Sequence, residues 1–257
     1  MKVVILAGGV GNVLAGDTDV GPKPMVEIGG RPLLWHILKH FSYYGLDQFV
    51  IAVGHRGDVI KQYLSHYRLN QNDVRIDVGK GEVVVYGEEP DVEWIAEVVD
   101  TGRRTQTAGR LLRLARILGD ETFMLTFGDA VADIDLNAVL ELHRAQERLV
   151  TITAVHPTPR FGELQLTGDR VSAFSEKPME SGWVNGGYMV MEPGVFEFIE
   201  GDHEPLSPGP LERLAAEGQL AAYQHIGFWQ SVDALRDKAM LDSLWSKGSA
   251  PWEIWKQ

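Results

Sequence analysis

The sequence predicts an α/β protein whose central sheet is twisted and mainly parallel, flanked by helices. Short, continuous, β-branched apolar runs at Val3–Leu6, Phe49–Val53 and Phe123–Phe127 are typical of strands buried on both faces. Between these runs apolar residues recur at helical spacing, so strands and helices alternate along the chain. The chain of 257 residues has no Pro- or Ser-rich linker, and we expect a single domain over 1–257.

The remaining elements follow from the same two periodicities. A first helix is expected after Pro32, because Pro suits the first helical turn and the apolar residues from Leu33 to Phe41 share a face. Alternating residues over 72–99 predict exposed strands, and therefore a smaller antiparallel insertion. Further helices are expected near 59–67, 109–118, 136–146, 194–199, 210–217 and 232–245, and further strands over 149–154, 163–167, 171–175 and 186–191.

Composition narrows the functional classes. A formal net charge of −12 argues against nucleic acid or an anionic membrane as a partner. The absence of cysteine excludes disulfides and thiolate zinc sites. The apolar opening is too short for a signal peptide or a membrane span, so a cytoplasmic protein is expected.

A glycine-rich segment follows the first strand and precedes a lysine between two prolines. Glycines 8, 9 and 11 let backbone N–H groups approach phosphates, and the prolines beside Lys23 restrict its backbone. Neither a P-loop nor a dinucleotide fingerprint fits, because Lys-Ser/Thr and a helix-opening third glycine are both missing. The pattern predicts a nucleoside triphosphate site, although a simple glycine turn explains the loop by itself equally well.

Acidic residues supply the second chemical feature. Asp129 ends the buried strand at the sheet edge that the glycines share, and Mg²⁺ prefers carboxylate oxygen together with substrate phosphates. Asp233 is a candidate second ligand. The alternative for Asp129 is a helix cap or an Asx turn. The alternative for Asp233 is a first-turn helix charge, and the residues alone favour that helix charge over a metal ligand. Asp133 and Asp135 are expected to cap the following helix.

Motifs spread from end to end identify a family resemblance. The chain resembles the sugar-1-phosphate nucleotidylyltransferases, and within them the branch that transfers cytidylyl groups to glucose-1-phosphate. The superfamily motifs are Leu6-Ala-Gly-Gly9 and Pro22-Lys-Pro24, and the branch motifs are Asn185-Gly-Gly187, Phe228-Trp-Gln230 and Ala250-Pro-Trp252.

The resemblance implies a Rossmann-like nucleotidyltransferase fold and a role in nucleotide-sugar biosynthesis. A sugar-1-phosphate oxygen attacks the α-phosphorus of CTP, which yields CDP-glucose and pyrophosphate. Lys23 corresponds to the catalytic residue, and Asp129 and Asp233 to the ligands of Mg²⁺. The implied nucleotide-binding residues are Leu6, Ala7, Gly8, Gly9, Gly11, Asn12, Thr105, Arg110 and Gly128, and the implied acceptor-binding residues are Glu176, Lys177, Asn185 and Gly186.

Two of these residues also have plain structural explanations, and the resemblance extends to assembly. Taken alone, Arg110 is a solvated helix residue and Lys177 an exposed turn lysine. Family members form oligomers, so we expect a homo-oligomer, with the strands over 72–99 and the tryptophan-rich tail as candidate contacts. Nucleic acid and membrane are not expected partners.

The loop departs from the family pattern at positions that carry positive charge. Val13 replaces an arginine and Gly21 a lysine, and each lost charge-assisted hydrogen bond costs about 1.5–3 kcal/mol if uncompensated. Three alternatives therefore stand beside the glucose-1-phosphate enzyme: a non-catalytic sugar-nucleotide-binding subunit, an enzyme with another acceptor, and a loop altered by introduced substitutions. Lys23, Asp129, Lys177 and Asp233 are retained and favour an enzyme.

Overall fold

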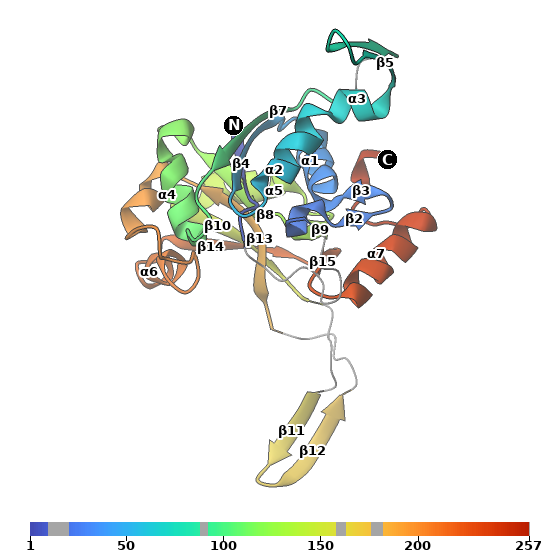
Figure 1. Cartoon of the computed structure of the whole chain (residues 1–257). Helices are drawn as coiled ribbons and strands as arrows, with labels where there is room; N and C mark the ends of the chain where they lie inside the picture. Colours follow the sequence, from blue (N-terminus) through green and yellow to red (C-terminus); the bar gives the residue numbers. More distant parts are fainter. Residues whose placement is uncertain (10–20, 88–91, 158–162, 176–181, 257) are drawn as a thin grey trace.

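A seven-stranded sheet forms the centre of the protein. The computed structural model describes residues 1–9, 21–87, 92–157, 163–175 and 182–256. Within them the strand order is β14-β10-β13-β8-β1-β4-β7, and β13 alone of these seven runs against the others (Figure 1). The strands are β1 (Lys2–Leu6), β4 (Gln48–Val53), β7 (Ile95–Asp100), β8 (Phe123–Phe127), β10 (Val150–Val155), β13 (Val184–Met191) and β14 (Leu220–His225). The prediction of a mainly parallel sheet is confirmed.

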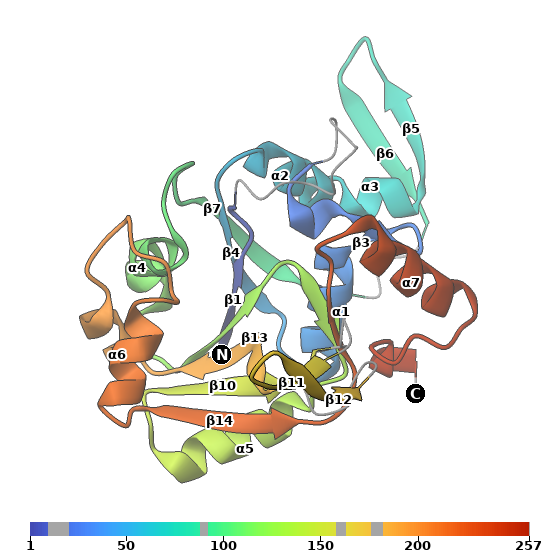
Figure 2. The same cartoon turned by 90° about the horizontal axis from the view of Figure 1, so that it is seen from below.

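Helices cover both faces of this sheet, as the strand pattern requires. In β1, Val3 and Ile5 face a core shared with α1, α2 and α5, whereas Val4 and Leu6 face a core shared with α4 and α6. Figures 1 and 2 show α4 and α6 on the opposite side of β1 from α1. The helices are α1 (Leu33–Tyr43), α2 (Gly57–Ser65), α3 (Tyr67–Gln71), α4 (Thr107–Leu118), α5 (Leu136–Gln146), α6 (Pro210–Ala216) and α7 (Leu235–Ser246).

A third, smaller apolar cluster lies away from the sheet, and we call it the satellite core. It joins the β2–β3 turn region (Glu27–Ile28 and Arg31–Pro32), strand β9 (Ala130–Ala132), the two residues that flank its partner strand β15 (Trp229–Ser231), and α7. Its buried members are Val26, Ile28, Leu33, Val131, Val232, Leu241 and Trp252. The C-terminal tryptophan Trp252 is therefore a core residue of its own chain.

The expected antiparallel portion over 72–99 is only partly antiparallel. Strands β5 (Asp73–Asp77) and β6 (Glu82–Tyr86) form a hairpin, but β7 joins the main sheet parallel to β4. Alternation misled the interpretation, because β7 is an edge strand with one face covered and one exposed. A second hairpin, β11 (Glu163–Thr167) with β12 (Arg170–Ser175), extends from the other end of the molecule in Figure 1.

Two smaller expectations also meet the structure here. Asp135 caps α5 by accepting hydrogen bonds from the N–H groups of Asn137 and Ala138, as predicted. The prediction for Asp133 is wrong, because its carboxylate accepts from the N–H of Phe228 and pairs with His225, which ties it to a distant loop instead. In the part of the chain that the structure describes, no helix is long and apolar enough to cross a membrane.

Candidate active site

Two adjoining cavities open at the carboxyl edge of the sheet, where β1 and β8 end side by side with Leu6 opposite Phe127. The first has a volume of about 210 Å³ and is lined by Leu6, Ala7, Gly9, Lys23, Pro24, Thr107, Phe127, Gly128 and Asp129. The second has about 350 Å³ and is lined by Leu6, Gly8, Gly9, Arg103, Arg104, Thr105, Gln106, Thr107 and Arg110. Most of the predicted nucleotide-binding residues that the structure describes therefore meet at one place.

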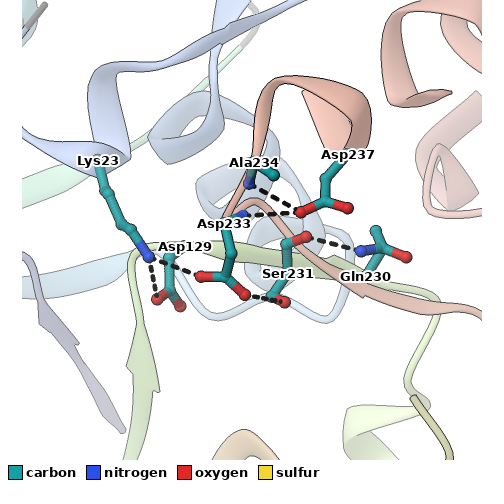
Figure 3. Close-up of polar contacts among 7 residues, drawn as sticks. All are labelled: Lys23, Asp129, Gln230, Ser231, Asp233, Ala234 and Asp237. Carbon is teal, nitrogen blue, oxygen red and sulfur yellow. Dashed lines mark hydrogen bonds and ion pairs between the residues drawn. The ribbon is translucent and has the colours of Figure 1, made fainter. Parts of the chain in front are cut away.

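The ammonium of Lys23 lies between two carboxylates from distant parts of the chain (Figure 3). Its Nζ donates a hydrogen bond to Asp233 Oδ1 at 2.8 Å and lies 3.6 Å from Asp129 Oδ2. All three side chains are partly exposed, at 27% for Lys23, 36% for Asp129 and 42% for Asp233. They are thus both held in place and accessible to a ligand.

The charges of this trio act on one another strongly. Burial alone would lower the pKa of Lys23, but the hydrogen bond and charge of Asp233, together with the charge of Asp129, raise it above its ordinary value. Loss of solvation within the protein raises the pKa of Asp129. The Lys23 ammonium opposes this rise, and the Asp233 carboxylate adds to it. Two carboxylates share one ammonium, so the trio keeps a net negative charge that a further cation would balance.

Backbone bonds fix the separation of the two acids. The N–H of Val232 donates to the carbonyl of Asp129 at 2.8 Å, which continues the β9–β15 pairing up to the acids. The hydroxyl of Ser231 donates to Asp233 Oδ2 at 2.8 Å. One oxygen of the buried Asp237 carboxylate accepts from the N–H groups of Asp233 and Ala234, at 3.1 and 2.9 Å (Figure 3).

Asp237 was missed by our sequence reasoning, although a signal was present. An acid in the first turn that accepts hydrogen bonds from N–H groups at the helix start is one half of a capping box. The sequence Ala234-Leu-Arg-Asp237 places an acid at this position. Asp233 is therefore not the first-turn charge of α7; Asp237 has that role and leaves Asp233 for the crevice.

Close backbone approach brings Lys23 to the strand ends. Lys23–Met25 forms a short 3-10 turn in which the N–H of Met25 donates to the carbonyl of Pro22 at 2.7 Å. A Cβ at Gly128 would lie 2.4 Å from Pro24 Cγ, so only glycine lets this turn pack on the end of β8. Gly21, which stands where the family has lysine, faces Val59.

Arg110 is buried, unlike the solvated helix residue that its position in α4 suggests, and is only 3% exposed. Its guanidinium donates to the carbonyl of Gly8, to the carbonyl of Gly102 at 2.8 Å, to that of Val53 at 3.1 Å and to Thr101 Oγ1 at 2.7 Å. A Cβ at Gly8 would lie 2.3 Å from Arg110 Nη1. Arg110 thus holds the backbone at Gly8 by a hydrogen bond and also lines the second cavity.

The described acceptor residues lie on the first residues of β13. Because β13 runs against its neighbours, Asn185 and Gly186 are beside the carboxyl end of β10. The indole N–H of Trp229 donates to the carbonyl of Gly186 at 2.8 Å, and Asn185 Oδ1 accepts from the N–H of Gly187 at 2.9 Å. The predicted residues Gly11, Asn12, Glu176 and Lys177, and the altered position Val13, lie outside the described residues.

The acids suit Mg²⁺ but would not enclose it. Among the described residues no group of three or more His, Asp or Glu side chains could hold a metal ion. Two carboxylates beside an open cavity are nevertheless the usual protein share of a magnesium site, because Mg²⁺ keeps several waters and takes its other ligands from substrate phosphates. The donor set therefore fits this ion.

A larger cavity of about 530 Å³ lies elsewhere, between α2, α3 and β7. Its lining includes Lys61, Arg68 and Trp94 but no carboxylate and no glycine. A nucleotide carried with a divalent ion finds neither a carboxylate ligand nor a glycine there. Size alone therefore does not identify the site, and the crevice at Lys23 remains the candidate.

An α/β sheet whose carboxyl edge joins glycine backbone, one lysine and two acids defines a nucleotide-dependent transferase in structural terms. The family model described as "Nucleotidyl transferase" matches residues 2–237, and the chain belongs to this family. This agrees with the resemblance that the motifs indicate.

The relatives lie within the same group of enzymes. The chain is 44% identical to the glucose-1-phosphate cytidylyltransferase of Salmonella typhimurium, over the full length of both proteins. It is 37% identical to the "Probable glucose-1-phosphate cytidylyltransferase" of Bacillus subtilis, over 99% of this chain and all of that protein. The crystal structure of HddC from Yersinia pseudotuberculosis complexed with GMP-PN has the same fold, with a TM-score of 0.69 at 19% identity over 95% of this chain and 99% of that one.

Proposed function

We propose that this protein transfers a cytidylyl group from CTP to glucose-1-phosphate, forming CDP-glucose and releasing pyrophosphate. The observation that carries the proposal is the convergence of Lys23, Asp129 and Asp233 at the glycine-lined cavity. Full-length similarity to a cytidylyltransferase that is specific for glucose-1-phosphate by name supports the choice of both substrates.

The reaction is an in-line displacement. An oxygen of the sugar phosphate forms a new bond to the α-phosphorus of CTP, while the bond from that phosphorus to the bridging oxygen breaks and pyrophosphate leaves with the electron pair. Such chemistry depends on positioning and on neutralising charge. Lys23 has the position for both tasks, because its ammonium is partly exposed at the cavity and is oriented by two acids.

Asp129 and Asp233 would hold Mg²⁺, which would neutralise the triphosphate and orient it. The Lys23 ammonium, which the same two acids orient at the cavity, would face the phosphates. The backbone from Leu6 to Gly9 would border the nucleotide, and Arg110 would keep that backbone in place. Thr105 and Gly128 complete the proposed nucleotide contacts, and Asn185 and Gly186, with Glu176 and Lys177, the acceptor contacts.

A pyrophosphate-release assay tests the proposal. The purified protein is incubated with Mg²⁺, each of the four ribonucleoside triphosphates and a panel of sugar-1-phosphates. CTP with glucose-1-phosphate should give the greatest kcat/KM. Turnover with another pair would redirect the proposal, and nucleotide binding without turnover for any pair would show a degenerate subunit instead.

Assembly and location complete the proposal. We place the activity in the cytoplasm, because both substrates are highly charged and do not cross membranes unaided. We also propose a homo-oligomer, supported by the apolar side chains that the β5–β6 hairpin exposes: Val74, Ile76, Val83, Val84 and Tyr86. Light scattering coupled to size exclusion should give a mass above the 28.5 kDa of one chain.

A further inference from the structure

We infer that Trp252, in the C-terminal segment, is a positioning residue for the reaction. It anchors the satellite core, and the satellite core holds the three chain segments that carry Lys23, Asp129 and Asp233 at their working separation. This inference rests on the proposed function for its catalytic consequence, whereas its geometric content can be tested without turnover.

The satellite core takes one valine from each of the three segments. Val26 lies three residues after Lys23, Val131 two residues after Asp129, and Val232 directly before Asp233. Their exposed fractions are 3%, 2% and 1%, and that of Trp252 is 1%. Each of the three charged side chains lies in the crevice, and a valine close to it in the chain is buried in the satellite core.

A hydrogen-bonded relay fixes Trp252 within this cluster. The indole N–H of Trp252 donates to His36 Nδ1 at 3.3 Å, and His36 Nε2 lies 3.0 Å from the carbonyl of Ile28. Since Nδ1 accepts, the proton is on Nε2, which donates to Ile28. The relay connects the C-terminal segment through α1 to β2, which directly follows the turn of Lys23.

A second link connects α7 to the same part of the chain. The N–H of Gly29 donates to Asp242 Oδ1 at 2.8 Å. A Cβ at Gly29 would lie 2.0 Å from Trp245 Cδ1, so the β2–β3 turn is pressed against the helix. Because α7 begins two residues after Asp233, its contacts with Gly29 join the segment of Asp233 to the segment that follows Lys23.

Without the side chain of Trp252, the distances between the Lys23 ammonium and its two acids should become more variable. No group that contacts substrate is removed. Misplacement by about 1 Å can cost roughly a hundredfold in rate. A positioning role therefore predicts a fall in kcat with little change in the KM of either substrate. A merely stabilising role predicts a lower melting temperature and an unchanged kcat below it.

Two variants test the inference at graded severity. Trp252→Phe keeps an aromatic ring but removes the N–H donor, and Trp252→Ala removes the anchor altogether. The matched control is Leu214→Ala. It opens a cavity at a fully buried position of α6, in the core that α4 and α6 share with the main sheet and outside the satellite core. All assays are run at a temperature at which circular dichroism shows each variant folded.

Two readouts are compared for each variant. The first is kcat and KM with CTP and glucose-1-phosphate, where Trp252→Ala should lower kcat about tenfold or more and Leu214→Ala should not. The second is the rate at which acetic anhydride acetylates Lys23, followed by peptide mass spectrometry. The ion pairs of Lys23 protect it from acetylation in the native protein. Acetylation should therefore be faster in Trp252→Phe than in the native protein, and fastest in Trp252→Ala.

The outcomes separate this inference from the proposed function. Unchanged Lys23 acetylation in both Trp252 variants, or equal acceleration in Leu214→Ala, would overturn the positioning role. If the native protein turns over no substrate pair, the acetylation rates still decide the inference while the proposed function fails.

Discussion

At the scale of single residues, the ammonium of Lys23 has one observed and one proposed role. It offsets half of the charge of the two neighbouring acids, and in the proposed reaction it is the cation available to the phosphates that the cavity would hold. A donor that is already oriented costs little reorganisation when charge develops in the transition state. This explains how the site could remain active although Val13 and Gly21 carry no charge.

Replacing Lys23 should therefore abolish most of the activity. We expect Lys23→Gln to lower kcat by about a hundred- to a thousandfold, the usual effect of removing one preorganised donor. Steady-state kinetics with CTP and glucose-1-phosphate provide the measurement. Lys61→Gln, at the cavity between α2 and β7, is the matched control and should leave kcat unchanged. Retention of more than a tenth of native kcat in Lys23→Gln would contradict the assigned role.

Sequence reasoning found the charged residues of the site more readily than their supports. Lys23 lies in a motif, Asp129 follows a buried strand and the family resemblance implies Asp233, and the structure brings the three together. The environment of Arg110 could not be read from local spacing, because its partners include Gly8, 102 positions away along the chain. A buried guanidinium that binds backbone carbonyls gives the same helical pattern as a solvated one.

At the scale of elements, the Lys23 turn packs closely on the end of β8. A methyl group at position 128 would lie 2.4 Å from Pro24 Cγ, within the range that real Cβ atoms do not occupy. The turn would have to move away from the strand and take Lys23 with it. Backbone, rather than a flexible side chain, would absorb the displacement.

We accordingly expect Gly128→Ala to lower kcat about tenfold or more and to destabilise the fold by about 1–3 kcal/mol, as overpacking does. Urea denaturation and steady-state kinetics measure the two effects. The control is Gly79→Ala in the β5–β6 hairpin, where the nearest contact of an added Cβ is an ordinary 3.5 Å. Equal behaviour of the two variants would show that the turn tolerates displacement.

The predictability of the elements follows their burial. Strand β8, of which every residue but the last is buried, was predicted with the bounds Phe123–Phe127, because a continuous apolar run of this length is typical of a strand covered on both faces. Strand β14 was not predicted, since Leu220–His225 is half exposed and rich in alanine, which indicates no period. The direction of β7 also could not be read, because alternation reports exposure and not the orientation of the neighbouring strand.

At the scale of the whole molecule, two buried histidines should make stability depend on pH. Burial lowers the pKa of His36 and of His40 to about 4, from an ordinary value of 6.5. Between these values the unfolded chain binds protons that the folded chain does not. Their contribution is fully present above pH 6.5 and is lost as the pH falls toward 4.

The free energy of unfolding should therefore fall by about 2 kcal/mol per histidine between pH 7 and pH 5. Urea denaturation at the two pH values measures this fall. His40→Gln should show a smaller fall than the native protein, because it removes one of the two buried imidazoles. An identical fall in the two proteins would mean that burial does not lower the pKa of His40.

The strand β13 runs antiparallel to both of its neighbours, β10 and β8. Its opening residues lie beside the end of β10, so the proposed acceptor residues and the proposed nucleotide residues are attached to strands that run in opposite directions. On the proposed function, substitutions around Asn185 would change the shape of the sugar pocket and leave the glycine-lined half unchanged. One reversed strand would thus let selectivity for the carbohydrate vary independently of triphosphate binding.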